Sequence, residues 1–128
     1  MLWQTPMFIQ GVEYTPPNTL PDLASDHVFR YCRFEKLEDS VTRQVDATFL
    51  SCVFSKCDFY WSLFNVALFS ECKFENCTFA GVTFADCLFI ECTFVECSFT
   101  KSNLGGPCTS ENTRWYGCKQ SDCTGLKN

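Results

Sequence analysis

Cysteine is the residue type in this chain with the most chemical potential, since 11 of the 128 residues are Cys. Thiols can form disulfides, ligate a soft metal ion or act as nucleophiles. Eight of them lie at multiples of five residues from one another: Cys32, Cys52, Cys57, Cys72, Cys77, Cys87, Cys92 and Cys97. A CxxxxC spacing differs from the CxxC of zinc sites, and the chain has a single His. The pattern therefore predicts no metal and no cofactor, and it directs attention to the element that repeats every five residues.

That element is centred on phenylalanine. Thirteen of the 14 Phe share one five-residue phase, and eleven consecutive centres are Phe49, Phe54, Phe59, Phe64, Phe69, Phe74, Phe79, Phe84, Phe89, Phe94 and Phe99. The position two residues before each of these centres holds only Cys, Ala, Ser or Val. A period of five fits neither a helix nor a flat strand. It fits a chain that turns a corner every five residues and points a small and a large side chain inward.

The runs CVFSKCDFYW, CKFENCTFAG and CLFIECTFVECSF resemble the pentapeptide-repeat family, whose usual unit is Ala-(Asp/Asn)-Leu-x-x with Leu or Phe at its centre. The resemblance covers about 80 of the 128 residues. It implies an all-β fold, a right-handed quadrilateral β-helix of about four coils. With four repeats in each coil, residues n and n+20 would stack. Such a solenoid needs capping segments at its ends.

The chain is expected to form one domain with three parts. Residues 1–24 are interpreted as an N-terminal cap without the repeat, which would cover the core with Trp3, Phe8, Ile9, Val12 and Tyr14. Residues 25–104 form the solenoid. Residues 105–128 form a C-terminal cap or an irregular extra coil centred on Trp115, and the cap is favoured because Ser110, Gln120 and Gly125 would be poor centres.

The repeat is interrupted between residues 36 and 46, where Asp39 and Gln44 stand in place of Phe. The sequence leaves open whether this stretch is a bulged loop or a poorly filled coil.

The repeat also predicts the role of the cysteines. Neighbours in a column would have parallel Cβ vectors, which disfavours the dihedral angle of a disulfide. Cys in the small position is therefore expected to act as a small buried hydrophobe. Cys108, Cys118 and Cys123 fall one residue out of phase, and we expect Cys118 and Cys123 to be the most reactive thiols.

Composition and motifs argue against several function classes. A net charge of −5 and a pI of about 4.7 disfavour a direct nucleic-acid binder. The sequence has no apolar run of membrane-spanning length and does not begin like a signal peptide, so a cytoplasmic protein without membrane contact is expected. G-x-S-x-G, Walker A and H-E-x-x-H motifs are absent, and His27 lies in an inward small position. The chain is predicted not to be an enzyme.

The outward positions carry the candidate binding residues. One face of the expected solenoid would present Leu50, Leu68, Leu88 and Ile90. A second apolar–aromatic cluster contains Tyr60, Trp61, Leu63 and Val66. Exposed apolar patches often mark interfaces. The outward acids are Glu71, Glu75, Asp86, Glu91 and Glu96, and we interpret them as a solvated face.

These patterns predict a non-catalytic module that presents a rigid wall to a protein partner or to a second copy of the chain. Two alternatives stay open. The family resemblance implies that the chain could mimic DNA and bind a type II topoisomerase such as gyrase, as quinolone-resistance members do. A small partner or immunity-type protein of a bacterial secretion pair is the other alternative.

Overall fold

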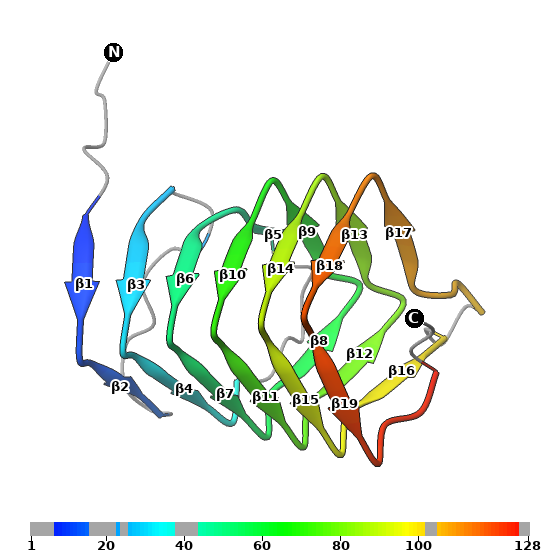
Figure 1. Cartoon of the computed structure of the whole chain (residues 1–128). Helices are drawn as coiled ribbons and strands as arrows, with labels where there is room; N and C mark the ends of the chain where they lie inside the picture. Colours follow the sequence, from blue (N-terminus) through cyan, green and yellow to red (C-terminus); the bar gives the residue numbers. More distant parts are fainter. Residues whose placement is uncertain (1–6, 16–22, 24–25, 38–43, 102–104, 126–128) are drawn as a thin grey trace.

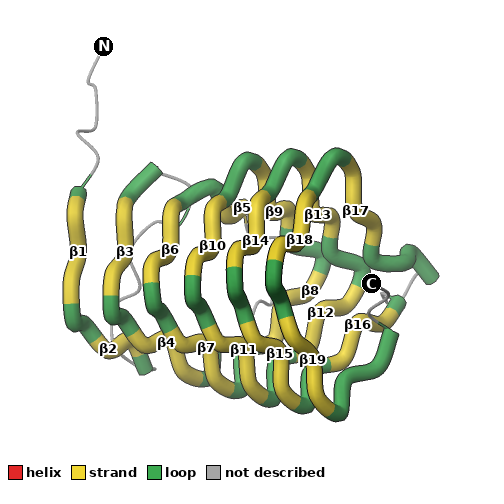
Figure 2. The backbone as a smooth tube through the Cα atoms, viewed as in Figure 1, coloured by secondary structure: helices red, strands yellow, loops and turns green. Residues whose placement is uncertain are grey.

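The computed structural model describes residues 7–15, 23, 26–37, 44–101 and 105–125. Over these residues the chain forms nineteen short strands wound as coils about one axis, and the described strands of the two chain ends lie at opposite ends of the stack (Figure 1). Strands alternate with loops throughout the described part, which contains no helix (Figure 2). The described residues therefore include no helix that could span a membrane.

Strands of successive coils pair in parallel and form four sheets, one on each face of the solenoid. The first face consists of β1 (Phe8–Gln10), β3 (Val28–Arg30), β6 (Thr48–Leu50), β10 (Leu68–Ser70), β14 (Leu88–Ile90) and β18 (Arg114–Tyr116). The second face consists of β2 (Glu13–Tyr14), β4 (Arg33–Glu35), β7 (Val53–Ser55), β11 (Lys73–Glu75), β15 (Thr93–Val95) and β19 (Lys119–Ser121).

The other two faces have fewer described strands. The third face consists of β8 (Asp58–Tyr60), β12 (Thr78–Ala80) and β16 (Ser98–Thr100). The fourth face consists of β5 (Gln44–Val45), β9 (Leu63–Asn65), β13 (Thr83–Ala85) and β17 (Thr109–Glu111). Within the strict repeat, Phe69 pairs with Phe49 and with Phe89, so partners are twenty residues apart. The quadrilateral β-helix expected from the sequence is confirmed.

Each corner of the coil is made by one residue in the left-handed backbone region, two positions after each Phe. From Ser51 to Glu96 the φ of the non-glycine corner residues is between 51° and 57°. This conformation costs a non-glycine residue about 1–2 kcal/mol. The turned N–H compensates by bonding the next coil, as Ser51 N does to Ser70 O at 2.8 Å and Glu71 N to Ile90 O at 2.9 Å.

The core consists of stacked Phe columns flanked by the small residues. Phe69 lies between Phe49 and Phe89, with ring centroids 4.8 and 4.7 Å away and ring planes within 7° of parallel. All eleven centres from Phe49 to Phe99 are less than 10% exposed. Burial of each Phe contributes roughly 1.5–3 kcal/mol before chain entropy is subtracted. The columns therefore provide most of the apolar stabilisation of the fold.

The N-terminal segment departs from its expected form, because it contains the repeat in the stretch that is described. Ile9 pairs with Phe29 and Tyr14 with Phe34, both twenty residues on, so the phase continues with residues other than Phe at the centres. The Tyr14 ring lies 5.3 Å from that of Phe34 at 19° and covers this end of the core. Phe8 is 59% exposed and does not contribute to the core. Val12 is also exposed, and Trp3 lies outside the described residues.

The interruption at 36–46 moves one core position by one residue but leaves the length of the coil unchanged, since Phe29 and Phe34 still pair with residues twenty positions on. Val45, not Gln44, occupies the core position, because Val45 pairs with Phe64 nineteen residues on. Val45 is buried and Gln44 is exposed. Leu37 fills the small inward position before the interruption. Asp39 lies outside the described residues.

The described part of the C-terminal segment is an extra coil, although the sequence favoured a cap. Its strands pair with residues 26 positions earlier: Ser110 with Phe84, Trp115 with Phe89 and Gln120 with Phe94. The register is therefore six residues longer than in the strict repeat. The Trp115 ring stacks 4.2 Å from Phe89 at 8°, which anchors this coil in spite of its poor neighbouring centres.

Candidate interaction surface

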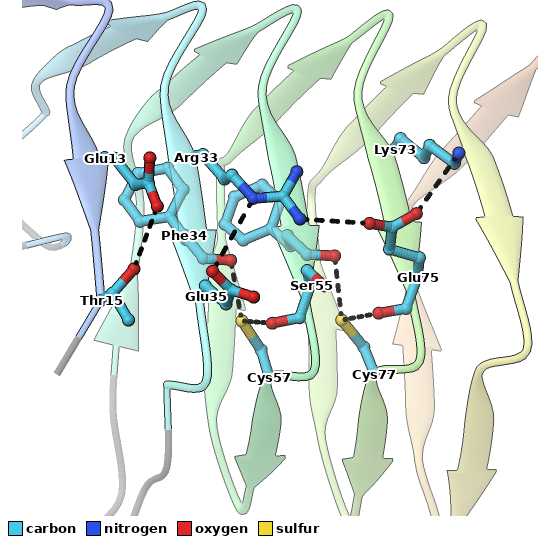
Figure 3. A network of polar contacts seen from close by, with 11 residues as sticks. Glu13, Thr15, Arg33, Phe34, Glu35, Ser55, Cys57, Lys73, Glu75 and Cys77 are labelled. Carbon is cyan, nitrogen blue, oxygen red and sulfur yellow. Dashed lines mark hydrogen bonds and ion pairs between the residues drawn. The ribbon is translucent and has the colours of Figure 1, made fainter.

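The cysteines form ladders of thiol hydrogen bonds between coils. All eleven are free thiols. The Sγ of Cys72 donates to the carbonyl oxygen of Phe49 at 3.3 Å and lies 3.5 Å from that of Ser70. The thiols of Cys57 and Cys77 on the second face make the equivalent contacts, each to the carbonyl oxygens of the residues 23 and two positions earlier in the chain (Figure 3). In the extra coil the first partner lies 29 residues earlier, as for Cys118 and Phe89.

This arrangement makes the thiols structural. Hydrogen bonding with neighbouring thiols and burial raise the pKa of Cys72 and of Cys77 above the ordinary value. Burial also raises the pKa of Cys87 and of Cys118. A raised pKa lowers the fraction of nucleophilic thiolate at neutral pH. Cys118 is half-buried, so the expectation that it is a reactive thiol has little electrostatic support.

His27 occupies the small inward position assigned to it from the sequence. It is 4% exposed, and its Nδ1 accepts a hydrogen bond from the Met7 backbone N–H at 3.0 Å. The imidazole therefore ties the N-terminal coil to the next one, and it packs edge-on against Phe29.

The outward apolar residues lie on more than one face. Leu68 and Leu88 pair directly on the first face. Leu50 and Ile90 lie on the same face, above and below Ser70. All four leucine and isoleucine side chains are half-buried. They lie on three successive coils, with Ser70 between Leu50 and Ile90.

Tyr60 and Trp61 lie elsewhere, at the end of the third face and at the corner that follows it. Tyr60 is half-buried and Trp61 is 44% exposed, with ring centroids 6.0 Å apart. Between this pair and the first face, the same coil presents Leu63 on the fourth face and Val66 at the next corner. The outward residues between the two clusters are of mixed type, since Asn65 lies between Leu63 and Val66.

Residues 67–106 match the family model for pentapeptide repeats, in eight copies. These residues are pentapeptide repeats. No curated protein matches it. Two solved structures are similar: QnrB1, a plasmid-mediated fluoroquinolone resistance protein (12% identity, TM-score 0.36, covering 92% of this chain and 72% of that one), and Rfr23, a pentapeptide repeat protein of the cyanobacterium Cyanothece 51142 (10% identity, TM-score 0.31, 92% and 84%).

Val66, a member of the second cluster, has an unusual backbone conformation for its residue type. It is a β-branched residue in the left-handed region, with φ 57°, and it is 65% exposed. Such a conformation is an outlier for a β-branched side chain. The other left-handed residues described at this corner of the pentapeptide coils are Asp26, Asp86 and Asn112, which are residue types that tolerate it. Once the corner position of the pentad is known, the sequence alone marks Val66 as unusual.

The outward acidic side chains of the pentapeptide repeats do not form one continuous negatively charged surface. Glu71 and Glu91 lie at the corner after the first face, Glu96 at the corner after the second, and Asp86 at the corner before the first. These four are exposed.

Glu75 is half-buried and lies within a network of opposite charges on the second face. Its carboxylate lies 3.5 Å from the Arg33 guanidinium and 3.3 Å from the Lys73 ammonium (Figure 3). Arg33 also approaches Glu35 at 3.9 Å. Much of the negative charge on this face is therefore neutralised locally.

Proposed function

We propose that this solenoid protein is a non-catalytic module that binds another protein through its apolar surface. The apolar surface is defined as Leu50, Leu68, Leu88 and Ile90 of the first face together with the corner residues Trp61 and Val66 and the adjoining Tyr60. Val66 carries the proposal.

Neither the backbone nor solubility accounts for Val at this corner. The left-handed conformation disfavours it by about 1–2 kcal/mol, and Asp or Asn fills the equivalent described corners. An exposed aliphatic side chain adds nothing to the folded monomer's stability. Backbone strain that persists in a structure is often linked to function. Burial of Val66 against a partner would offset the strain.

The scaffold suits recognition because it is rigid. The surface residues lie on or next to strands paired on both sides, as β10 is with β6 and β14. Binding would therefore immobilise little additional backbone, which reduces the entropic cost of association. Trp and Tyr at the end of the surface are residue types that often anchor interfaces.

A DNA-mimic role has less support from the charges. The outward acids are spread over three corners, and Glu75 is in contact with Arg33 and Lys73. A mimic of duplex DNA would present a continuous negative field. We expect no inhibition and no protection of gyrase in a supercoiling assay at micromolar protein.

The test is the solution mass of the wild type and of Leu88→Glu, measured by light scattering under reducing conditions. The matched control is Thr93→Glu, since Thr93 occupies the same half-buried outward position on the second face. A dimer that Leu88→Glu abolishes and Thr93→Glu preserves identifies the partner as a second copy.

If all three proteins are monomers, quantitative affinity capture with the same three baits decides. A protein retained by the wild type and Thr93→Glu but lost with Leu88→Glu supports the proposal. If no retained protein responds to Leu88→Glu, the proposal is wrong.

A further inference from the structure

The third face, formed by β8, β12 and β16, lies between two columns of corner residues (Figure 1). The column before this face begins with cations and ends with acids. From the N-terminal to the C-terminal coil it consists of Lys36, Lys56, Asn76, Glu96 and Asp122, which directly follow paired strands of the second face. All five side chains are exposed, and their φ angles are between 52° and 56°. The charge along this edge therefore changes sign from one end to the other.

The opposite charges of this column do not satisfy each other within the chain. Lys56 and Glu96 lie two coils apart, which is about 10 Å at the strand spacing of a sheet. This separation is close to the Debye length of about 10 Å at 0.1 M ionic strength, so salt screens much of their attraction. Among the residues that the structure describes, neither side chain makes an ion pair within the chain. Both charges are therefore available to a partner.

The column after the third face contains a second complementary pair with the same spacing. Trp61, Gly81 and Lys101 directly follow β8, β12 and β16. Trp61 and Lys101 are exposed and again lie two coils apart. An ammonium group is attracted to the face of an indole ring. Each side of the third face thus carries two complementary groups, one beside β8 and the other beside β16.

We propose that the third face binds a second copy of the chain, turned end for end about a two-fold axis that runs along β12. In this arrangement β8 of one copy faces β16 of the other. Lys56 then meets Glu96 of the second copy, and Trp61 meets Lys101 of the second copy. Each contact occurs twice, as in any isologous interface. The interface goes beyond the proposed function, because it shares only Tyr60 and Trp61 with the apolar surface and uses none of its leucines.

The residues on the axis favour the third face over the other three. A two-fold axis places every residue on it opposite its own copy, so a charged residue there would meet a like charge. The axis along β12 passes through residues that are all small or uncharged: Asn76, Thr78, Ala80 and Gly81. The same operation about β10, β11 or β13 would bring Glu71, Lys73 or Asp86 opposite itself.

Pairing of this kind is selective more than it is tight. Individual exposed ion pairs contribute little to stability, and salt screens them. Complementary charges mainly determine which partner binds and in which orientation. Lys36 and Asp122 form an outer pair under the same symmetry. We therefore expect a dimer that forms at high protein concentration and low ionic strength and dissociates in salt.

Sedimentation equilibrium under reducing conditions tests the interface, up to millimolar protein. The association constant of the wild type should fall about tenfold or more between low ionic strength and about 1 M salt, where the Debye length is about 3 Å. Lys56→Glu and Glu96→Lys should each weaken association by about tenfold, because each places like charges opposite one another twice. The double variant exchanges the signs of both pairs, keeps the net charge, and should associate like the wild type.

The matched control is Lys119→Glu, which makes the same charge change at an exposed lysine of the second face and should leave association unchanged. Corner positions already hold both Lys and Glu, so all the variants should fold, and their unfolding midpoints verify this. The proposal is overturned if the wild type stays monomeric at millimolar protein in low salt, if the single variants associate like the wild type, or if the double variant does not recover.

Cross-linking locates the contact. A zero-length carbodiimide reagent is applied to an equal mixture of unlabelled and nitrogen-isotope-labelled protein in low salt. We expect linked Lys56 and Glu96 peptides that carry one label each, which can come only from two copies. A dimer without this mixed product would place the interface elsewhere and overturn the proposal.

The outcome also separates this interface from association through the first face. Leu88→Glu should leave the third-face dimer intact. A dimer that Leu88→Glu abolishes, and that the Lys56 and Glu96 variants leave unchanged, overturns the third-face interface while it supports the proposed function.

Discussion

The thiol of Cys72 donates a hydrogen bond of 3.3 Å to the carbonyl oxygen of Phe49 in the neighbouring coil. The stacked Phe rings of the core are therefore only part of what holds neighbouring coils together. Thr113 makes the equivalent contact to Phe84 O at 3.1 Å where Cys is absent. Ala47, Ala67 and Val82 fill the same position without a donor, so the position requires a small side chain and the hydrogen bond is added where Cys or Thr occupies it.

Cys72→Ala should lower the free energy of unfolding by about 1–2 kcal/mol, because a buried hydrogen bond and a sulfur atom are both lost. Cys72→Ser keeps a donor and should lose less than Cys72→Ala. Urea unfolding under reducing conditions measures both. An alanine variant as stable as the wild type would show that the thiol contact contributes nothing.

The protein should lose stability as the pH rises above about 9. Burial raises the pKa of Cys87 and of Cys118 in the folded state, so these thiols release protons first in the unfolded state. The unfolded state then binds fewer protons, and the free energy of unfolding falls with increasing pH. In the stacked thiol column, hydrogen bonds raise the pKa of Cys72 but lower the pKa values of Cys52 and Cys92, so the contributions of that column oppose one another. Between pH 6 and 8 Cys87 and Cys118 are protonated in both states and contribute no slope. Cys87→Ala should reduce the loss between pH 8.5 and 10, and an unchanged slope would contradict this assignment.

Phe74→Ala should destabilise the fold by about 3–5 kcal/mol, because its ring stacks on Phe54 and Phe94 at 4.7 and 4.8 Å and the cavity left would be closed on both sides. Phe99→Ala should lower the free energy of unfolding by a smaller amount. The Phe99 ring stacks face to face on Phe79 alone and borders a cavity at the C-terminal end of the core. Chemical denaturation of the two variants gives the comparison. Equal losses would mean that the end of the core is as tightly packed as its middle.

Val66→Asn should raise the free energy of unfolding by about 1 kcal/mol, since Asn tolerates the left-handed backbone and exposes no apolar surface. The reciprocal control is Asn76→Val at an exposed corner with φ 54°, which should destabilise by a similar amount. Thermal and urea unfolding test both. Under the proposed function, Val66→Asn should also weaken partner binding while it stabilises the monomer, and weaker stability in this variant would refute the strain argument.

The central solenoid could be predicted from the sequence because one residue type marks every turn. From Phe49 to Phe99 the phase and the inward small residues follow from the spacing, and the pairing twenty residues apart follows from the four repeats per coil that the family resemblance implies. Each of these features is a direct expression of side-chain size in a narrow core. Local sequence and global fold agree at every position there.

The terminal coils were harder to predict from the sequence, because the core accepts residues other than Phe where a coil has fewer neighbouring coils to pack against. Ile9 and Tyr14 keep the phase, but neither looks like the repeat that marks the centre. Near residue 45 the core position moves by one residue, from Gln44 to Val45, within a coil of unchanged length. After Phe99 the register lengthens by six residues, and Trp115 alone is large enough to show where the coil resumes.

The interaction surface was only partly visible for a different reason. The outward leucines follow directly from the period, but the strain at Val66 depends on the backbone angle of the corner. The close approach of Gly125 to the Phe99 carbonyl likewise depends on the altered register of the last coil. Neither is a property of one residue's type.

Pairing between neighbouring coils alone also determines how the molecule would respond to force. A strand such as β10 is bonded only to β6 and β14, so tension applied at the chain ends removes the outermost coil without disturbing the rest. Each released coil of twenty residues adds about 65 Å of extended chain. The protein should therefore lengthen under load in regular steps, with one coil released in each step.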